Sequence, residues 1–470
     1  MLYQKFRRSS LDMTPLGLIT GPDESDSVYT PARARMVAWG ADQSFHFCQV
    51  EGFGDTVFAV DPSAPPGDCV QPVAKNLSDF IGLVITCADA ELIAKAYRLS
   101  SYLFDKKRSE VTRNARTNAV LRAVQNNYRP NLMDSPYEYI MAMQENFPYD
   151  TLPLRADYFE WCPIRPGMLR WNVGFGTGFA DHCEKAQAGQ ELRLERGFLW
   201  SNEDWKVPSI YLCDNGIVVD SYLEVPGESM ARFQDKWSRR EASQMSIEEQ
   251  MRRKLDDPLG VEVRSMLTVN GKPAPMKKIE ILRWDPTVEN DWHTRRTLEH
   301  YGLDRNKAYL LRREHFLRRG KNPPIREIEL SLQAEPVAVP GQRFIAPRAG
   351  EMMSFTHPAT GQVHTLRVIA QTREALDPNF LSNHPCCYTR LSFSLDPQLD
   401  AELFSIVDCD PGDPFESGPE APASALLAGK IPAAGHYALS SMRYVPADTI
   451  TWRMIFRQKL RSDVTVRLLP

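Results

Sequence analysis

Residues 45–60 read FHFCQVEGFGDTVFAV, and this stretch decides the fold that we expect for the first part of the chain. Before the glycine-rich segment 51–55, Phe45 and Phe47 alternate with other residues, and a second apolar run follows the segment. Two β-prone runs joined by a short connection that contains glycine are typical of a β-hairpin. We therefore predict strands over residues 37–60, paired through the turn at 51–55.

The residues after this hairpin predict one more extended segment and then helices. Proline, glycine and aspartate crowd residues 61–68, which indicates a turn, and a short extended segment follows at 69–74. Apolar residues then recur at the i, i+3, i+4, i+7 spacing of a helix, which either Asn76 or Ser78 can cap. Asp89 can cap a second helix in the same way.

Composition limits the classes of protein to which the chain can belong. Its 470 residues suggest roughly three domains. Hydrophobic residues make up 43% and charged residues 25%, which is the balance of a folded protein, and the net charge of −4 gives no general reason to expect nucleic acid. The nine cysteines form no CxxC pair, and no apolar run approaches the ~18 residues of a membrane helix. We expect a cytoplasmic protein with reduced thiols and no membrane contact.

We expect an α+β, multi-domain chain. The expected parts are an α+β domain at 1–110, a mixed domain after a helical linker at 111–240, a charged helical and hairpin segment at 241–325, and a β-rich domain at 326–470. In the third part, residues 297–319 are expected to be helical and basic. The β-rich domain is predicted as sandwich-like because short strands recur with turn residues between them. Those strands are expected at 351–356, 363–370, 387–395, 402–407, 450–457 and 463–469.

A glycine motif in the second part suggests a cofactor loop. Gly174, Gly176 and Gly178 form a G-x-G-x-G pattern that resembles the loop of S-adenosylmethionine-dependent methyltransferases, and Glu195 follows near the spacing at which an acid meets a ribose. Against this, the lead-in is polar at alternate positions, and Asn172 stands where that family usually has an acidic residue. A glycine-bent antiparallel strand is the simpler interpretation. We expect no cofactor and keep a transferase as an alternative function.

Histidine and cysteine occur close together in the C-terminal part without the spacing of a metal site. His357 and His364 flank an expected hairpin turn, and His384 lies near Cys386 and Cys387. Zinc needs three or four converging nitrogen or sulfur ligands, and no standard spacing for them appears. We therefore expect no metal.

A basic stretch at 295–321 provides a second alternative function. Its arginines and lysines, with aromatic residues among them, have the charge and stacking surface that a nucleic-acid site needs. The other interpretation, which we prefer, is a solvated helix whose arginines pair with Glu299, Glu314 and neighbouring elements. Nucleic-acid binding is therefore not our main expectation.

Four motifs follow one another across residues 37–107, namely Trp39-Gly40, the hairpin at 45–60, VQPVA at 70–74 and LSDFIGL at 77–83. This order resembles the SUKH superfamily, which comprises bacterial toxin-immunity proteins and fungal glucan-synthesis regulators. The family usually opens with a helix and a short Leu-Pro segment, which residues 1–36 do not show clearly. The rest of the chain resembles only uncharacterised multi-domain bacterial proteins.

The resemblance implies a non-enzymatic α+β module that binds another protein, in immunity or regulation, through a sheet face and its loops. The partner-binding residues that we expect are Asp42, Glu51, Phe53, Asp55 and Asp61. Their acids would steer a basic partner, such as a nuclease toxin, by electrostatic attraction. The alternative is that these acids cap turns, as aspartate often does.

Overall fold

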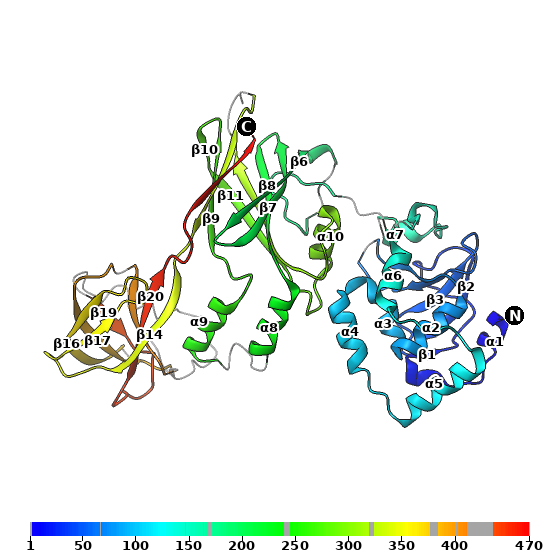
Figure 1. The fold of residues 1–470 in the computed structure, drawn as a ribbon, viewed down its shortest axis with the longest axis horizontal. Coiled ribbons are helices and arrows are strands. Elements are labelled where there is room, and N and C mark those ends of the chain that lie inside the picture. Colours follow the sequence, from blue (N-terminus) through cyan, green and yellow to red (C-terminus); the bar gives the residue numbers. More distant parts are fainter. Residues whose placement is uncertain are drawn as a thin grey trace. The chain divides into compact units, whose positions relative to one another are not determined.

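The computed structural model describes most of the chain. The described residues are 2–65, 67–145, 147–162, 164–167, 171–181, 183, 185–238, 245–318, 324–376, 384–400, 402–410 and 436–469. The fold is α+β, as expected, and combines helices with several antiparallel sheets (Figure 1). The chain divides into two compact units, each made of separate segments. Unit 1 comprises Met1–Leu199, Glu203–Ala231 and Ala274–Ile325, and unit 2 comprises Trp200–Asn202, Arg232–Pro273 and Arg326–Pro470.

Unit 1 begins with a five-stranded sheet in which neighbours in sequence are neighbours in space. In order, the strands are β1 (Leu18–Ile19), β2 (Ala34–Gly40), β3 (His46–Val50), β4 (Val57–Val60) and β5 (Val70–Ala74). The predicted hairpin is the antiparallel pair of β3 and β4, in which Phe47 lies opposite Ala59. The glycine-rich residues 51–55 connect these two strands, so this prediction is confirmed.

Short α-helices pack around this sheet, and in the described part of the chain one of them precedes it and six follow it. They are α1 (Leu2–Arg7), α2 (Leu77–Cys87), α3 (Ala90–Ala94), α4 (Ser101–Glu110), α5 (Ala115–Tyr128), α6 (Pro136–Gln144) and α7 (Tyr158–Trp161). Two predicted caps are confirmed. The Asn76 side chain accepts a hydrogen bond from the Asp79 amide at the start of α2, and Asp89 accepts hydrogen bonds from the first amides of α3. Each cap satisfies amide groups that have no partner inside the helix.

The first sheet is buried on both faces, which is why every residue of β3 and β4 is buried. On one face, Phe47 and Val57 share a core with residues of α2 to α6. On the other face, Cys48 and Phe58 pack in a second core with Tyr158 of α7. Because α5 and α6 belong to the first of these cores, that core continues beyond residue 110, where the sequence suggested a domain boundary.

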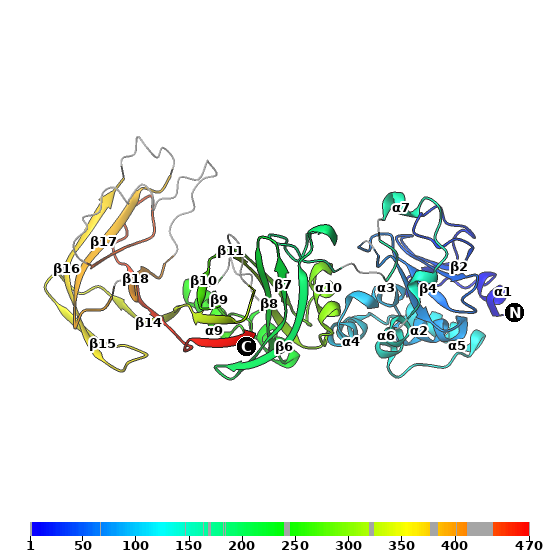
Figure 2. The same cartoon turned by 90° about the horizontal axis from the view of Figure 1, so that it is seen from above.

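A second sheet lies later in unit 1. In spatial order, its strands are β11 (Met276–Trp284), β12 (Ala308–Leu317), β8 (Gly216–Val225), β7 (Glu203–Cys213) and β6 (Gln190–Trp200). Helix α10 (Trp292–Tyr301) lies beside this sheet (Figure 2), and its Leu298 shares a core with Tyr222 and Tyr309 of the strands.

The prediction that residues 297–319 are helical holds only for 297–301 and is wrong for the described residues after them. Helix α10 ends at Tyr301, and β12 lies between β11 and β8. The charges of β12 are buried rather than solvated, since Arg313 pairs with Asp220 of β8 at 2.7 Å. The many charges of this segment suggested a solvated helix. The sequence could not show that Arg313 has an acidic partner, because Asp220 lies on a strand far away in the chain.

Unit 2 contains a four-stranded sheet and two further sheets that share one core. The first has the order β10 (Lys272–Ala274), β9 (Val263–Val269), β13 (Ile328–Ala334) and β21 (Val464–Leu469). The second has the order β14 (Val337–Ile345), β20 (Thr451–Gln458) and β18 (Phe404–Asp408), and the third β15 (Met352–Thr356), β16 (Val363–Ala375), β17 (Cys387–Asp396) and β19 (His436–Leu439). Trp452 of the second sheet and Leu366 of the third lie in one core, so these two sheets pack against each other.

The buried His46 on β3 predicts that unit 1 loses stability in mild acid. Its ring is 1% exposed, and burial lowers its pKa to about 4. The folded chain therefore keeps His46 neutral, whereas the unfolded chain binds a proton below its ordinary pKa of about 6.5. Stability is fully present above that pH and falls by about 3 kcal/mol as the pH drops toward 4.

We expect His46→Gln to flatten this acid slope when the Tm of the full chain is measured at steps between pH 7 and pH 4. Glutamine keeps a polar group that can reach Thr30, which lies 3.1 Å from Nε2 of His46. Parallel pH profiles for the wild type and the variant would contradict the assignment.

Candidate functional site

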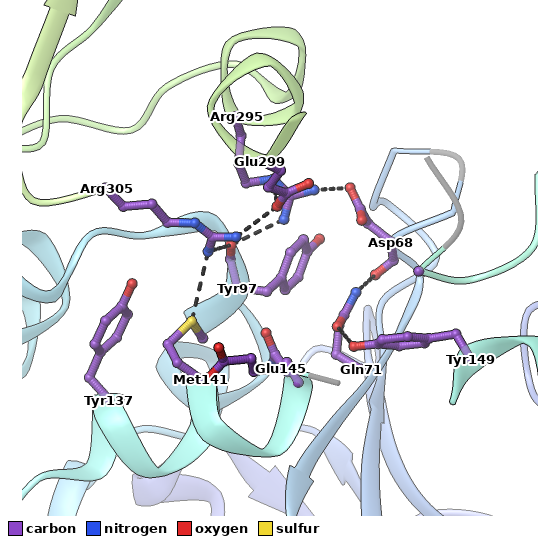
Figure 3. A pocket seen from close by; sticks show the side chains of 12 residues that line it. Asp68, Gln71, Tyr97, Tyr137, Met141, Glu145, Tyr149, Arg295, Glu299 and Arg305 are labelled. Carbon is purple, nitrogen blue, oxygen red and sulfur yellow. Dashed lines mark hydrogen bonds and ion pairs between the residues drawn. The ribbon is translucent and has the colours of Figure 1, made fainter. Parts of the chain in front are cut away.

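Unit 1 contains a polar cavity of about 400 Å³ (Figure 3). Its walls come from the turn between β4 and β5, from β5, from α6 and from α10. The residues that line it are Asp68, Gln71, Tyr97, Tyr137, Met141, Gln144, Glu145, Tyr149, Gly167, Arg295, Glu299 and Arg305. Most of these side chains are charged or carry a hydrogen-bonding group, so the cavity suits a polar ligand rather than an apolar one.

Two helices present lining residues on one face each. Tyr137 and Met141 are four residues apart on α6, and Arg295 and Glu299 are four residues apart on α10. Residues at this spacing lie one above the other on a helix. Glu145 follows as the C-terminal cap of α6, where Figure 3 shows its side chain next to Met141.

A buried ion pair closes one side of the cavity. Arg295 of α10 binds the carboxylate of Asp68 in the turn between β4 and β5, and their side chains are only 6% and 7% exposed. Arg295 also donates to the carbonyl of Tyr97 at 3.1 Å. Burial raises the pKa of the Asp68 carboxyl, and the attraction of Arg295 acts in the opposite direction.

The cavity is lined by further charged side chains besides this pair. Arg305 donates to Glu299 at 2.7 Å, and Arg305 also reaches the carbonyl of Tyr97 at 3.2 Å. Among the described residues, no ion pair involves the exposed carboxylate of Glu145. Three carboxylates thus face two guanidinium groups, and the cavity carries one negative charge in excess.

The phenol groups of the cavity are neutral and already hydrogen-bonded. Tyr149 donates to Oε1 of Gln71 at 2.7 Å, and Tyr137 donates to the carbonyl of Leu99 at 2.8 Å. Burial raises the pKa of the Tyr97, Tyr137 and Tyr149 hydroxyls. Their rings therefore act as walls along which an alkyl or aromatic part of a ligand can lie.

Two glycines bring the backbone segments of the cavity together. The Gly167 amide donates to the Gly67 carbonyl at 2.7 Å, and both residues have positive φ. A Cβ on Gly167 would lie 2.2 Å from the ring of Tyr149, so only glycine leaves room for that ring.

The five residues that the sequence suggested for partner binding do not form one surface. Asp42 lies in the turn after β2 and Asp61 in the turn after β4, whereas Glu51 and Asp55 lie in the turn after β3. Successive turns of an antiparallel meander lie at opposite ends of the sheet, here about 17 Å apart along the five residues of β3.

The two aspartates at the first end act in their own turns. Asp61 is buried, accepts hydrogen bonds from Ser63 and pairs with Arg98 at 2.8 Å. Asp42 accepts a hydrogen bond from the Ser44 amide, and its hydrogen bonds with Ser44 lower the pKa of its carboxyl. These contacts are those of turn caps, which was the alternative interpretation.

The turn at the other end remains exposed. Glu51 lies 3.6 Å from Arg33, and both side chains are largely in solvent, so this pair is weak. Asp55 is exposed, and Phe53 is half-buried between Phe58 and Phe147. Glu51 and Asp55 are therefore available to a partner, and Phe53 mainly holds the turn in place.

The glycine motif forms a loop against the second sheet of unit 1. Gly174 makes an antiparallel bridge with Ala188, and the Gly176 amide donates to Nδ1 of His315 on β12 at 3.0 Å. A Cβ on Gly178 would overlap the carboxylate of Glu280 on β11. The loop is thus packed on side chains at the place where a cofactor loop would need space.

The segment after this loop is a strand. Residues Gln190–Trp200 form β6, on which Glu195 is exposed and lies 3.8 Å from Arg193. A nucleotide loop needs a parallel strand, a turn and a helix that points its N-terminus at the phosphate. The arrangement here differs from that unit and gives the transferase alternative no support.

The basic stretch is largely used inside unit 1. Arg295 pairs with Asp68, Arg312 with Glu314, and Arg313 with Asp220. Residues 319–321 lie outside the described part of the chain. The described arginines therefore form no exposed strip of the kind that nucleic-acid binding requires.

Within the described residues, no group of three or more histidine, cysteine, aspartate or glutamate side chains converges as a metal site would require. His364 instead contacts the Pro397 carbonyl at 2.8 Å, and His357 accepts from the Ala359 amide. No described helix has both the length and the apolar character that crossing a membrane requires.

Comparison with protein-family models, with curated proteins and with solved structures finds no match to the chain. The cavity itself was missed by sequence reasoning. Its central pair joins residues 68 and 295, and no local pattern links positions so far apart. The only signal was the i, i+4 arrangement of Arg295 and Glu299, which is equally common on solvated helices.

We expect Asp68→Asn to destabilise unit 1 by about 3 kcal/mol, because it leaves the buried guanidinium of Arg295 with only the weaker contact to Glu299, at 3.7 Å, as counter-charge. The double variant Asp68→Asn with Arg295→Met should recover most of this loss, since it removes both buried charges. The matched control is Glu51→Gln, which breaks an exposed pair and should leave the Tm nearly unchanged. Thermal unfolding of the full chain checks all three, and an effect of Asp68→Asn as small as that of Glu51→Gln would contradict the role of the pair.

Proposed function

We propose that the chain is a non-catalytic protein-binding protein, with an immunity or regulatory role of the SUKH kind, that captures a basic side chain of its partner in the cavity of unit 1. The observation that carries the proposal is the excess of carboxylates in this cavity, where Asp68, Glu145 and Glu299 face only two guanidinium groups. A lysine or arginine would restore the balance of charge.

The shape of the cavity fits such a side chain. The aliphatic stem can lie along Met141, while its charged end reaches the carboxylate of Glu145, which Figure 3 shows next to Met141 in the lining of the cavity. A cation over a phenol ring gains further attraction from the electrons of the ring. Since Glu145 has no ion-pair partner among the described residues, it can bind a new cation without losing an existing one.

The order of elements supports the resemblance on which the proposal draws. Four antiparallel strands, β2 to β5, are followed directly by α2, which is the order that the sequence suggested for a SUKH-like module. The exposed acids Glu51 and Asp55 would contribute by attracting a basic partner from a distance. A location in the cytoplasm belongs to the same proposal.

Calorimetric titration of the full chain with octa-lysine and octa-arginine tests this function. Both peptides should bind, octa-glutamate should not, and affinity should fall as salt rises. We expect Glu145→Gln to weaken binding by about tenfold, which corresponds to ~1.4 kcal/mol.

The matched control is Glu138→Gln, because Glu138 is an exposed acid on the same helix that does not line the cavity. It should change the dissociation constant by less than about twofold. If both variants lose affinity equally, the peptides are attracted to the acidic surface in general and the proposed site is wrong. If neither basic peptide binds the wild-type chain, the proposal is refuted.

A further inference from the structure

Two cysteines that are distant in sequence share one hydrogen-bond partner in unit 1. The Tyr158 hydroxyl lies 3.5 Å from Sγ of Cys69 and 3.2 Å from Sγ of Cys162. Both thiols are 1% exposed and belong to the core on the side of the first sheet opposite α2. The proposed binding function uses neither of them.

The backbone segments that carry these cysteines are in direct contact. Gly67, two residues before Cys69, accepts a hydrogen bond from the Gly167 amide at 2.7 Å. A Cβ built on Gly67 would lie 3.3 Å from the carbonyl oxygen of Arg165, three residues after Cys162. A disulfide requires two chain segments that approach as closely as this.

We propose that Cys69 and Cys162 are a dithiol that a hydroperoxide oxidises to an intramolecular disulfide. The bond would join the turn between β4 and β5 to the end of α7. Asp68 and Gly167, which line the cavity, lie on these two segments, so the disulfide would fix the frame of the binding site.

The two thiols are unequal in a way that assigns their roles. A hydrogen bond from the Cys69 thiol is the largest cause that lowers the pKa of Cys162, and the hydroxyl of Tyr158 adds to it. The same interaction between the thiols, together with burial, raises the pKa of Cys69. Because Cys162 also lies next to the exposed Trp161, we assign Cys162 as the thiolate that reacts first and Cys69 as the thiol that resolves the product.

The reaction consists of two displacements. The Cys162 thiolate attacks one oxygen of hydrogen peroxide, the O–O bond breaks, and the leaving hydroxide takes up a proton to become water. Cys162 is then a sulfenic acid. The sulfur of Cys69 attacks the sulfenic sulfur, the S–O bond breaks, and the hydroxide leaves with the proton of Cys69 as a second water. Two thiols and one peroxide thus give one disulfide and two waters.

The neighbourhood gives a small oxidant a route to this pair. Trp161, next to Cys162, is 68% exposed, and α7 has only four residues. A helix of this length at the surface opens locally at low cost. Cys48 offers the contrast, because it lies on β3 in the middle of the same core.

The test treats the full chain with hydrogen peroxide, blocks the remaining thiols under denaturing conditions and maps the peptides by mass spectrometry without reduction. We expect a linked peptide pair that contains Cys69 and Cys162 and that dithiothreitol separates. Cys48→Ser should still form the link, and Cys162→Ser should lose it. Trapping with a sulfenic-acid reagent should label Cys162 in Cys69→Ser.

Peptide mapping of the oxidised wild-type chain shows whether Cys69 and Cys162 form the disulfide, even if a variant does not fold. If Cys69 and Cys162 stay free after the partly exposed cysteines have reacted, the proposal is overturned, and random linkage of Cys69 to other cysteines would overturn it as well. The result is independent of peptide binding, because the linkage is read from mass alone.

Discussion

The buried ion pair between Arg295 and Asp68 is the constraint on which the arrangement of unit 1 depends. Burying two charges costs free energy of desolvation, which only their mutual attraction and their hydrogen bonds can offset. This requirement holds the first turns of α10 against the turn between β4 and β5. The cavity lies where these elements meet. Its other ion pair, between Arg305 and Glu299, lies next to the pair of Arg295 and Asp68.

The other end of α10 is fixed by a second polar contact. The Tyr301 hydroxyl donates to Asp220 of β8 at 2.7 Å, and Arg313 of β12 donates to both oxygens of the same carboxylate at 2.9 and 2.7 Å. One helix is therefore anchored to the first sheet through Arg295 and to the second through Tyr301. Since both anchors are charged or hydrogen-bonded, they specify the position of the helix more narrowly than apolar packing alone.

The features that the sequence could predict are local ones. The hairpin at 45–60, the caps at Asn76 and Asp89 and the strands of the two sheets that share a core in unit 2 follow from alternation, turn residues and capping chemistry within a few residues.

The features that could not be predicted depend on residues far apart in the chain. The strand β12 has many charges, and only the position of Asp220 on a neighbouring strand explains how Arg313 can be buried. The acidic residues expected to form one surface lie at two ends of the first sheet, because an antiparallel meander places successive turns at opposite ends. Cys69 and Cys162 likewise both reach the Tyr158 hydroxyl only because α7 packs against the sheet.

The proposed cation would bind between α6 and α10. Hydrogen–deuterium exchange of the full chain, measured with and without octa-lysine, tests this binding most directly. We expect slower exchange in peptides that cover residues 141–145 and 295–299, with little change elsewhere. Slower exchange confined to residues 51–55, with both helices unchanged, would contradict it and would place binding on the exposed turn after β3.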